Sequence, residues 1–306
     1  MRRAPGSKSE SVVSVTVLSA VDPIEWVVAP FRDSVTMQRG LWAGTFAAIA
    51  CGLVGTWVVL RGMTFLGDAL AHGVVPGLAI ATVIGFNLTV GALISAAVMV
   101  LGITLVGRRT NLTEDTSIGL LFVGMLPVGV LVISSSQSFA GELTGFLFGG
   151  ITSVTTADLW LGAGVAVGVI TTMIVGYRAF IVLAFNRGTA TLLGLRPGLT
   201  HAVLLVLVTA TVVASFKTVG SLLVFALITA PAAAATQLVR RVPVVMAVSV
   251  GLAELSVVSG LLISWHHRLA AGASMATSAV ALFVIAVVIV EVRRWWASRS
   301  VTAAPT

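Results

Sequence analysis

Apolar residues run almost unbroken for about 20 positions at a time along the chain, separated by short stretches that contain charged or turn-forming residues. A helix needs about 20 mostly apolar residues to cross the hydrocarbon core of a bilayer. Nine runs have this length, so the pattern predicts an all-α polytopic membrane protein. The predicted spans are Leu41–Leu60, Thr64–Gly85, Leu88–Gly107, Thr116–Ile133, Leu159–Tyr177, Pro197–Phe216, Thr218–Val239, Val242–Trp265 and Ala270–Val290.

The connections between these spans leave no room for a separate soluble domain. A weaker apolar stretch, residues 11–31, is interrupted by acidic residues and prolines. It is a tenth crossing or re-entrant piece, a segment in the membrane interface, or a cleaved signal peptide. The predicted divisions are an N-terminal segment (1–36), a transmembrane domain (37–295) and a cytoplasmic tail (296–306).

The composition agrees with a membrane location. Hydrophobic residues make up 58% of the 306 residues and charged residues only 9%, whereas a soluble domain carries about 25% charged residues. This excludes soluble enzymes and nucleic-acid-binding domains, although the formal net charge is +7. Cys51 is the single cysteine, so the chain offers neither an internal disulfide nor a thiolate cluster for a metal.

The basic residues predict the orientation. If the C-terminus is cytoplasmic, the inside connections carry eleven arginines, whereas the outside connections hold only Lys217 and Arg268. Positive charge is concentrated in cytoplasmic loops of membrane proteins. We therefore expect a multi-pass membrane protein with a cytoplasmic C-terminus. The inside arginines are Arg61, Arg108, Arg109, Arg178, Arg187, Arg196, Arg240, Arg241, Arg293, Arg294 and Arg299.

Two ionisable residues lie close together in the second predicted span. Asp68 and His72 are four residues apart, which places both side chains on one face of a helix, about 5–6 Å from each other. Charged groups at membrane depth are costly and are functional candidates by default. A carboxylate with an imidazole suits a divalent transition metal such as zinc or manganese. The alternative is an Asp–His pair that neutralises itself, or a cap near the helix start.

The residues after this pair favour an irregular helix. Gly73, Pro76 and Gly77 would loosen it and free backbone carbonyls, which a membrane tolerates only beside protein or a water-filled cavity. One carboxylate and one imidazole make an incomplete metal site. Methionine and serine side chains from other spans, or water, would have to complete it.

The other candidates have simpler interpretations. Glu254, in the eighth predicted span, is either a proton or metal relay or a carboxylate hydrogen-bonded to Ser256 or a neighbouring helix, and we favour the second. His201 is interpreted as an interfacial residue at the start of the sixth span. His266 and His267 lie in an outside loop, where a surface role is favoured over metal collection.

Two stretches carry a resemblance to a known family. Leu60–Gly77, preceded by Met37–Leu41 and Ala50–Gly55, has the arginine, methionine, Gly-Asp, histidine and Pro-Gly order of the membrane permeases of bacterial zinc, manganese and iron ABC importers. Phe216–Ala235 resembles the valine-glycine and proline-alanine run of the same family. The resemblance covers about residues 37–295. The family has Ser where this chain has Ala71, so this chain lacks that hydroxyl.

The resemblance implies a cobalamin-importer-like permease bundle in the bacterial plasma (inner) membrane that works as a homodimer, with Asp68 and His72 as metal ligands on the pathway. It implies no permanent cofactor: the divalent zinc, manganese or iron ion is the cargo. ATPase subunits would dock at the Asn186–Arg196 connection, and an extracytoplasmic metal-binding protein would deliver the metal, for which 134–158 is the natural surface.

No Gly-x-x-x-x-Gly-Lys-Ser/Thr pattern occurs in the chain, so ATP would be hydrolysed on a separate subunit and the chain is not itself an enzyme. A gradient-driven secondary cation carrier, with Glu254 and Asp68 as proton relay groups, is the alternative. An intramembrane enzyme ranks last, because no His-Glu-x-x-His motif is present. One oxygen and one nitrogen ligand do not distinguish zinc from manganese.

Overall fold

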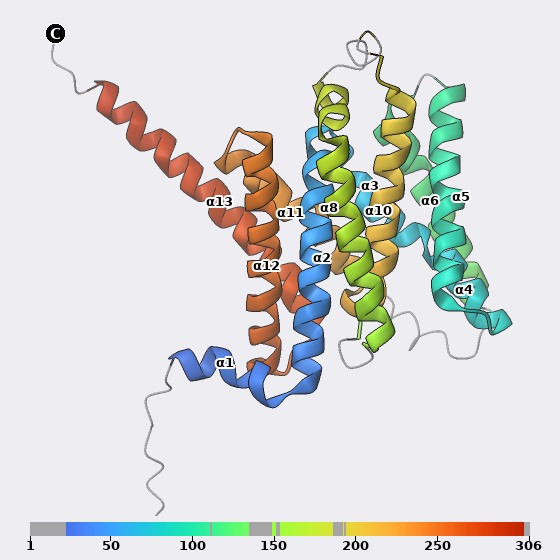
Figure 1. Ribbon diagram of the computed structural model, residues 1–306, viewed down its shortest axis with the longest axis horizontal. Coiled ribbons are helices and arrows are strands. Elements are labelled where there is room, and N and C mark those ends of the chain that lie inside the picture. The colour runs from blue at the N-terminus through green and yellow to red at the C-terminus, as the bar shows by residue number, and fades with distance from the viewer. Residues whose placement is uncertain are drawn as a thin grey trace, which may run out of the picture.

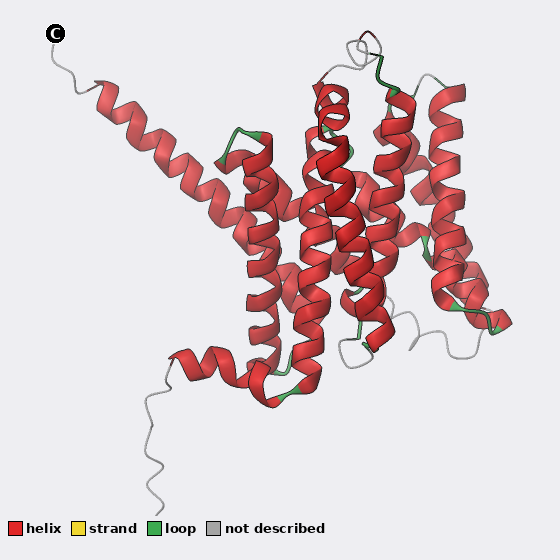
Figure 2. Ribbon diagram, in the orientation of Figure 1, coloured by secondary structure: helices red, strands yellow, loops and turns green. Residues whose placement is uncertain are grey.

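The computed structural model of the chain describes residues 23–110, 112–134, 149–150, 154–185, 192 and 194–302. Most helices stand side by side in a bundle, whereas the first lies across one end and the last leaves the bundle obliquely (Figure 1). Within the described ranges every regular element is helical (Figure 2). The all-α prediction is therefore confirmed.

The helices agree closely with the predicted spans. Eight stretches of the described residues are long and apolar enough to cross a membrane, and α11 has a shorter apolar part, Leu223–Leu238. The second predicted span is divided into two helices. The bounds are α1 (Pro23–Asp33), α2 (Val35–Leu60), α3 (Phe65–Gly73), α4 (Val75–Ile84), α5 (Leu88–Arg109), α6 (Glu114–Ser134), α8 (Thr156–Phe185), α10 (Pro197–Val219), α11 (Ser221–Leu238), α12 (Val242–His267) and α13 (Ala271–Thr302).

The weak N-terminal stretch forms a short helix where it is described. Helix α1 has 11 residues and lies across the end of α2 (Figure 1), whereas a crossing needs about 20 residues. Helix α1 is therefore too short to cross the membrane on its own. A tenth span over residues 11–31 would need residues 11–22, which lie outside the described part.

Polar residues start several helices at the membrane boundary. The Ser34 hydroxyl caps α2 by accepting from the N–H of Met37 over 3.3 Å. Asn87 caps α5 in the same way, accepting from the N–H of Thr89 over 2.9 Å. Such caps satisfy the first N–H groups of a helix, which have no partner within it.

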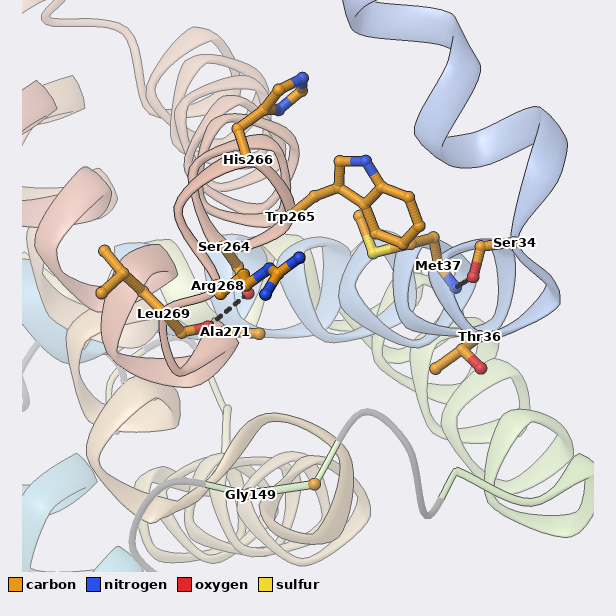
Figure 3. Close-up of a pocket in the computed structure, with 11 residues that line it drawn as sticks. Ser34, Thr36, Met37, Gly149, Ser264, Trp265, His266, Arg268, Leu269 and Ala271 are labelled. Carbon is orange, nitrogen blue, oxygen red and sulfur yellow. Dashed lines mark hydrogen bonds between the residues drawn. The ribbon is translucent and has the colours of Figure 1, made fainter. Parts of the chain in front are cut away.

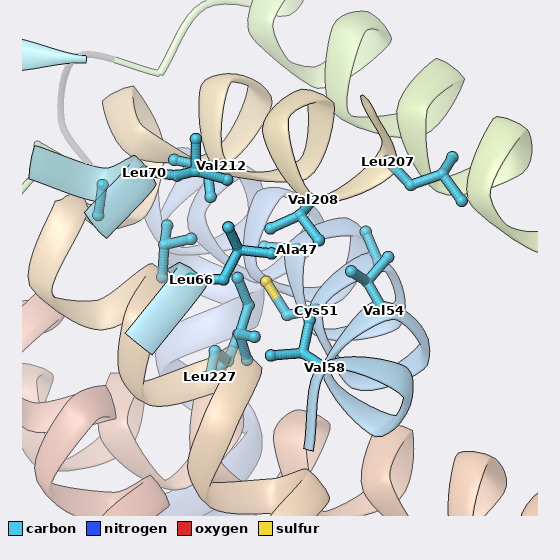
Figure 4. Close-up of a cluster of buried hydrophobic side chains, with 14 of the residues drawn as sticks. Ala47, Cys51, Val54, Val58, Leu66, Leu70, Leu207, Val208, Val212 and Leu227 are labelled. Atoms are coloured by element: carbon cyan, nitrogen blue, oxygen red, sulfur yellow. The ribbon is translucent and has the colours of Figure 1, made fainter. Parts of the chain in front are cut away.

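Helix α2 is the centre of the packed core. It contacts α8, α10, α11 and α12 along its length, and Trp57 and Cys51 on it are fully buried. Leu66 and Leu70 of α3 and apolar residues of α10 belong to the same cluster of buried side chains (Figure 4). This cluster fixes α3 inside the bundle.

The alternation of helix direction sorts the charges into two ends. The C-terminal ends of α2 and α5 and the N-terminal ends of α10 and α12 lie at one end of the bundle, opposite α1 (Figure 1). The first end carries Arg61, Arg109, Arg196 and Arg240, and we call it the arginine-rich end. The opposite end, which carries α1 and Arg268, is called the α1 end.

Candidate metal site

The helix that carries Asp68 and His72 is interrupted directly after them. Helix α3 ends at Gly73, and α4 starts at Val75 with Pro76 in its first turn. Proline has no N–H, so it cannot donate to the carbonyl four residues earlier, which is that of His72. Next to this break, the Gly73 carbonyl accepts a buried hydrogen bond of 2.6 Å from the Ser95 hydroxyl of α5.

The helix is therefore interrupted where the sequence predicts a loosened span. Close packing against α5 holds the interrupted segment in place. A Cβ added to Gly77 would collide with the backbone carbonyl of Gly91 in α5. Small residues let helix backbones approach this closely in a membrane. The glycine after the proline thus sets the distance between α4 and α5, which a larger residue would increase.

Asp68 and His72 face each other along α3. The distance between Asp68 Oδ1 and His72 Nε2 is 3.4 Å, and the side chains are 26% and 16% exposed. Helices α5, α6, α10 and α11 contact α3, so the pair lies within a ring of helices and is still partly accessible. Such a carboxylate and imidazole offer one oxygen and one nitrogen donor to a cation.

The surroundings of His72 add soft and aromatic groups but no third strong ligand. The His72 ring lies 5.5 Å from the Phe122 ring of α6, and its Nδ1 is buried without a hydrogen-bond partner. Met99 of α5 packs directly against Gly73. Within the described residues, no group of three or more His, Cys, Asp or Glu side chains could hold a metal ion. One chain thus supplies an incomplete donor set.

Glu254 has a different environment. The Thr45 hydroxyl of α2 donates a 2.7 Å hydrogen bond to Oε1 of Glu254, and Oε2 is buried without a partner. The Ser256 hydroxyl bonds instead to the carbonyl of Leu252 in its own helix. The interpretation of Glu254 as hydrogen-bonded to a neighbouring helix is supported, with Thr45 as the partner that sequence spacing could not identify.

His201 forms a hydrogen bond to another part of the bundle. Its Nδ1 accepts a 2.9 Å hydrogen bond from Arg61 Nη1, which links the start of α10 to the end of α2. Both side chains are half-buried. These residues lie 140 positions apart in the sequence, so no local motif predicts the contact.

His266 and His267 lie at the α1 end, beside a surface hollow of about 820 Å³ (Figure 3). The His266 ring stacks on Trp26 at 4.0 Å, and its Nδ1 lies 2.9 Å from the Leu262 carbonyl. The described residues that line the hollow include Arg268 but no carboxylate. The hollow therefore presents positive charge, which favours the surface interpretation of these histidines over metal collection.

Comparisons with known proteins agree with this architecture. Residues 33–290 match the model of the ABC 3 transport family. The manganese transport system membrane protein MntC of Halalkalibacterium halodurans is 32% identical over 250 residues, which are 82% of this chain and 86% of that protein. A probable iron transport system membrane protein of Haemophilus influenzae is 29% identical, covering 88% of this chain and 98% of that one.

A solved structure shares the same fold. It is PsaBC from Streptococcus pneumoniae in complex with Fab, with a TM-score of 0.77 and 27% identity, covering 86% of this chain and 95% of that chain.

The chain belongs to the ABC 3 transport family. It is thus the membrane permease subunit of an ABC transporter, and ATP hydrolysis takes place on a separate subunit. This confirms the resemblance inferred from Leu60–Gly77 and Phe216–Ala235. The alternative of a gradient-driven secondary carrier is set aside, because the relatives and the structural neighbour are ABC transport proteins.

Proposed function

We propose that the chain is the permease of an ATP-driven importer whose cargo is a divalent transition metal, with manganese first and iron second. The observation that carries the proposal is the Asp68–His72 pair, 3.4 Å apart and partly accessible within a ring of helices. Relatives named for manganese and iron transport support this choice of cargo. Zinc was also compatible with the residues alone, but none of the relatives compared above is named for it.

Asp68 and His72 act as cargo ligands on the pathway. A hard carboxylate oxygen and an imidazole nitrogen together suit Mn²⁺ and Fe²⁺. The incomplete donor set fits a passage site, because tight binding would hinder release. Release requires that the two conformations of the transporter differ in metal affinity.

The permease works as a homodimer, in which a second copy completes the donor set. One chain offers two strong ligands at this position and, within the described residues, no cluster of three. A second Asp68 and a second His72 would bring the number to four. The partial exposure of both side chains, 26% and 16%, leaves them accessible for such sharing.

The arginine-rich end faces the cytoplasm, so the C-terminus of the chain is cytoplasmic too. The excess of arginine at that end supports this orientation. ATPase subunits dock there at the Asn186–Arg196 connection, most of which lies outside the described residues. An extracytoplasmic metal-binding protein docks at residues 134–158 at the α1 end, most of which lie outside the described residues.

Reconstitution in liposomes tests the proposal. The permease, its ATPase and the metal-binding protein would be assembled, and radioactive manganese uptake would be measured with ATP, without ATP, and with an imposed proton or sodium gradient alone. We expect uptake only with ATP. Uptake driven by a gradient without ATP would contradict the proposal, and so would ATP-dependent transport that excludes both manganese and iron.

A further inference from the structure

A polar contact joins the start of α10 to the turn that leads into α3. Arg61 Nη1 donates to His201 Nδ1 over 2.9 Å. A guanidinium group has only donors, so Nδ1 of His201 accepts and carries no proton in this arrangement. The contact therefore depends on an acceptor at one defined atom of residue 201.

Arg61 is firmly connected to the helix that carries the metal ligands. It lies in the turn between α2 and α3, where Met63 is 1% exposed. The Met63 carbonyl accepts from the N–H of Leu66 in the first turn of α3, over 3.0 Å. Asp68 follows two residues later and His72 one turn further. A displacement of Arg61 is thus transmitted to the start of this short helix.

His201, in turn, lies close to the proposed ATPase-docking connection. It lies in the first turns of α10, five residues after Arg196, the last residue of the connection at which we place the ATPase. The Arg196 carbonyl accepts from the N–H groups of Leu199 and Thr200, over 3.0 and 3.1 Å. The start of α10 is therefore continuous with the end of that connection.

Deeper in the bundle, Leu66 and Leu70 of α3 belong to one cluster of buried apolar side chains with Val208 and Val212 of α10 (Figure 4). Apolar packing is non-directional and tolerates small shifts of one helix along another. A hydrogen bond is directional and fixes one arrangement. The Arg61–His201 hydrogen bond thus adds a directional contact to this apolar packing.

We infer that Arg61 and His201 are positioning residues, whose hydrogen bond links movement of the ATPase-docking connection to movement of the Asp68–His72 helix. The inference rests on the proposed function and names a contact through which ATP hydrolysis is coupled to cargo movement. Neither residue needs to touch the metal. Loss of the contact should let the ATPase turn over without moving cargo.

The test uses the complete transporter in liposomes and measures manganese uptake per ATP hydrolysed. His201→Leu removes the acceptor, whereas His201→Asn retains an acceptor oxygen at the position of Nδ1. We expect His201→Leu to lower the uptake per ATP by about tenfold, since the hydrogen bond between the charged Arg61 side chain and residue 201 is lost. We expect His201→Asn to stay within about twofold of wild type, since it keeps that acceptor. Thr171→Leu, at an exposed position of α8 whose hydroxyl bonds to the Val167 carbonyl of its own helix, is the control.

A double variant separates coupling from simple loss of packing. Arg61→Gln with His201→Leu should be no worse than either single variant, because both remove the same bond. Wild-type coupling in His201→Leu would overturn the inference, and so would equal losses in His201→Leu and His201→Asn, or additive losses in the double variant. Absence of manganese uptake in the wild-type complex would instead count against the proposed function, so the two failures are distinguishable.

Discussion

Two helices of this permease carry a carboxylate at membrane depth, and the two carboxylates have opposite surroundings. Helix α12 runs unbroken for 26 residues, and its Glu254 is bonded to Thr45 of the neighbouring helix. Helix α3 has nine residues, ends directly after the Asp68–His72 pair, and leaves both side chains partly exposed. A charged residue inside a span costs about 2.5–3.5 kcal/mol on insertion scales, so each needs an explanation.

The difference indicates which carboxylate serves the cargo. Glu254 has a hydroxyl partner on another helix, and its second oxygen is sealed from solvent. That arrangement satisfies a polar group and holds two helices together. Asp68 has an imidazole partner on its own helix. Its side chain is partly accessible, and the helix is interrupted beside it. Accessibility and an incomplete donor set are what a passing cation requires.

The largest expected effect is at the accessible pair. Asp68→Asn removes the negative charge of one metal ligand and His72→Leu removes the other ligand, so we expect ATP-dependent manganese uptake to fall to the background of empty liposomes in both. Tracer uptake by the reconstituted complex measures this. Retention of half or more of the wild-type rate by both variants would remove the pathway role of the pair.

A smaller effect is expected where α4 and α5 touch. A Cβ at residue 77 would collide with the Gly91 carbonyl, and overpacking of this kind costs about 1–3 kcal/mol. Gly77→Ala should therefore lower the thermal unfolding temperature of the detergent-solubilised permease. Gly164→Ala is the control, because nothing lies within 4 Å of a Cβ built there. Equal unfolding temperatures for the two variants would contradict the close approach of α4 and α5.

The serine at the helix break should contribute less. Ser95→Ala removes the donor to the Gly73 carbonyl, and a typical hydrogen bond contributes about 1 kcal/mol. Ser256→Ala serves as a comparison, because this hydroxyl bonds only to the carbonyl one turn earlier in its own helix. Thermal unfolding followed by tryptophan fluorescence should give a lower midpoint for Ser95→Ala than for Ser256→Ala. The reverse order would mean that the break does not depend on Ser95.

The smallest effect is expected at Glu254. Glu254→Gln keeps an acceptor for the Thr45 hydroxyl and almost the same volume, so manganese uptake should remain within about twofold of wild type. The same tracer assay applies. A loss as large as that of Asp68→Asn would mean that both carboxylates serve transport, and the contrast between α3 and α12 would fail.

Much of the fold could be predicted from the sequence, because the bilayer imposes a simple rule on length and polarity. Each of the nine apolar runs corresponds to helical structure. The break in the second span was anticipated from Gly73, Pro76 and Gly77, since proline removes a backbone donor. The helix boundaries were predicted less accurately. The turn after α10 is at Gly220, whose φ of 89° suits glycine, whereas the predicted spans placed it near Lys217.

The site could be predicted only where its members share a helix. Asp68 and His72 are one turn apart, and the spacing alone places them on one face. Thr45, Ser95 and Phe122 approach the candidate residues from other helices, and no local pattern specifies how helices pack across a bundle. The partnership of Arg61 with His201 was missed for the same reason.

The central claim is that Asp68, and not Glu254, contacts the metal in transit. Replacing each in turn by cysteine tests it directly, because a thiolate prefers soft ions such as cadmium. The background is favourable, since Cys51 is the only native cysteine and is fully buried.

The measurement is the thiolate-to-cadmium charge-transfer absorbance of the purified permease–ATPase complex during titration with cadmium. We predict a saturable band for Asp68→Cys that manganese-loaded wild type and Glu254→Cys do not give. No band for Asp68→Cys, or an equal band for Glu254→Cys, would contradict it.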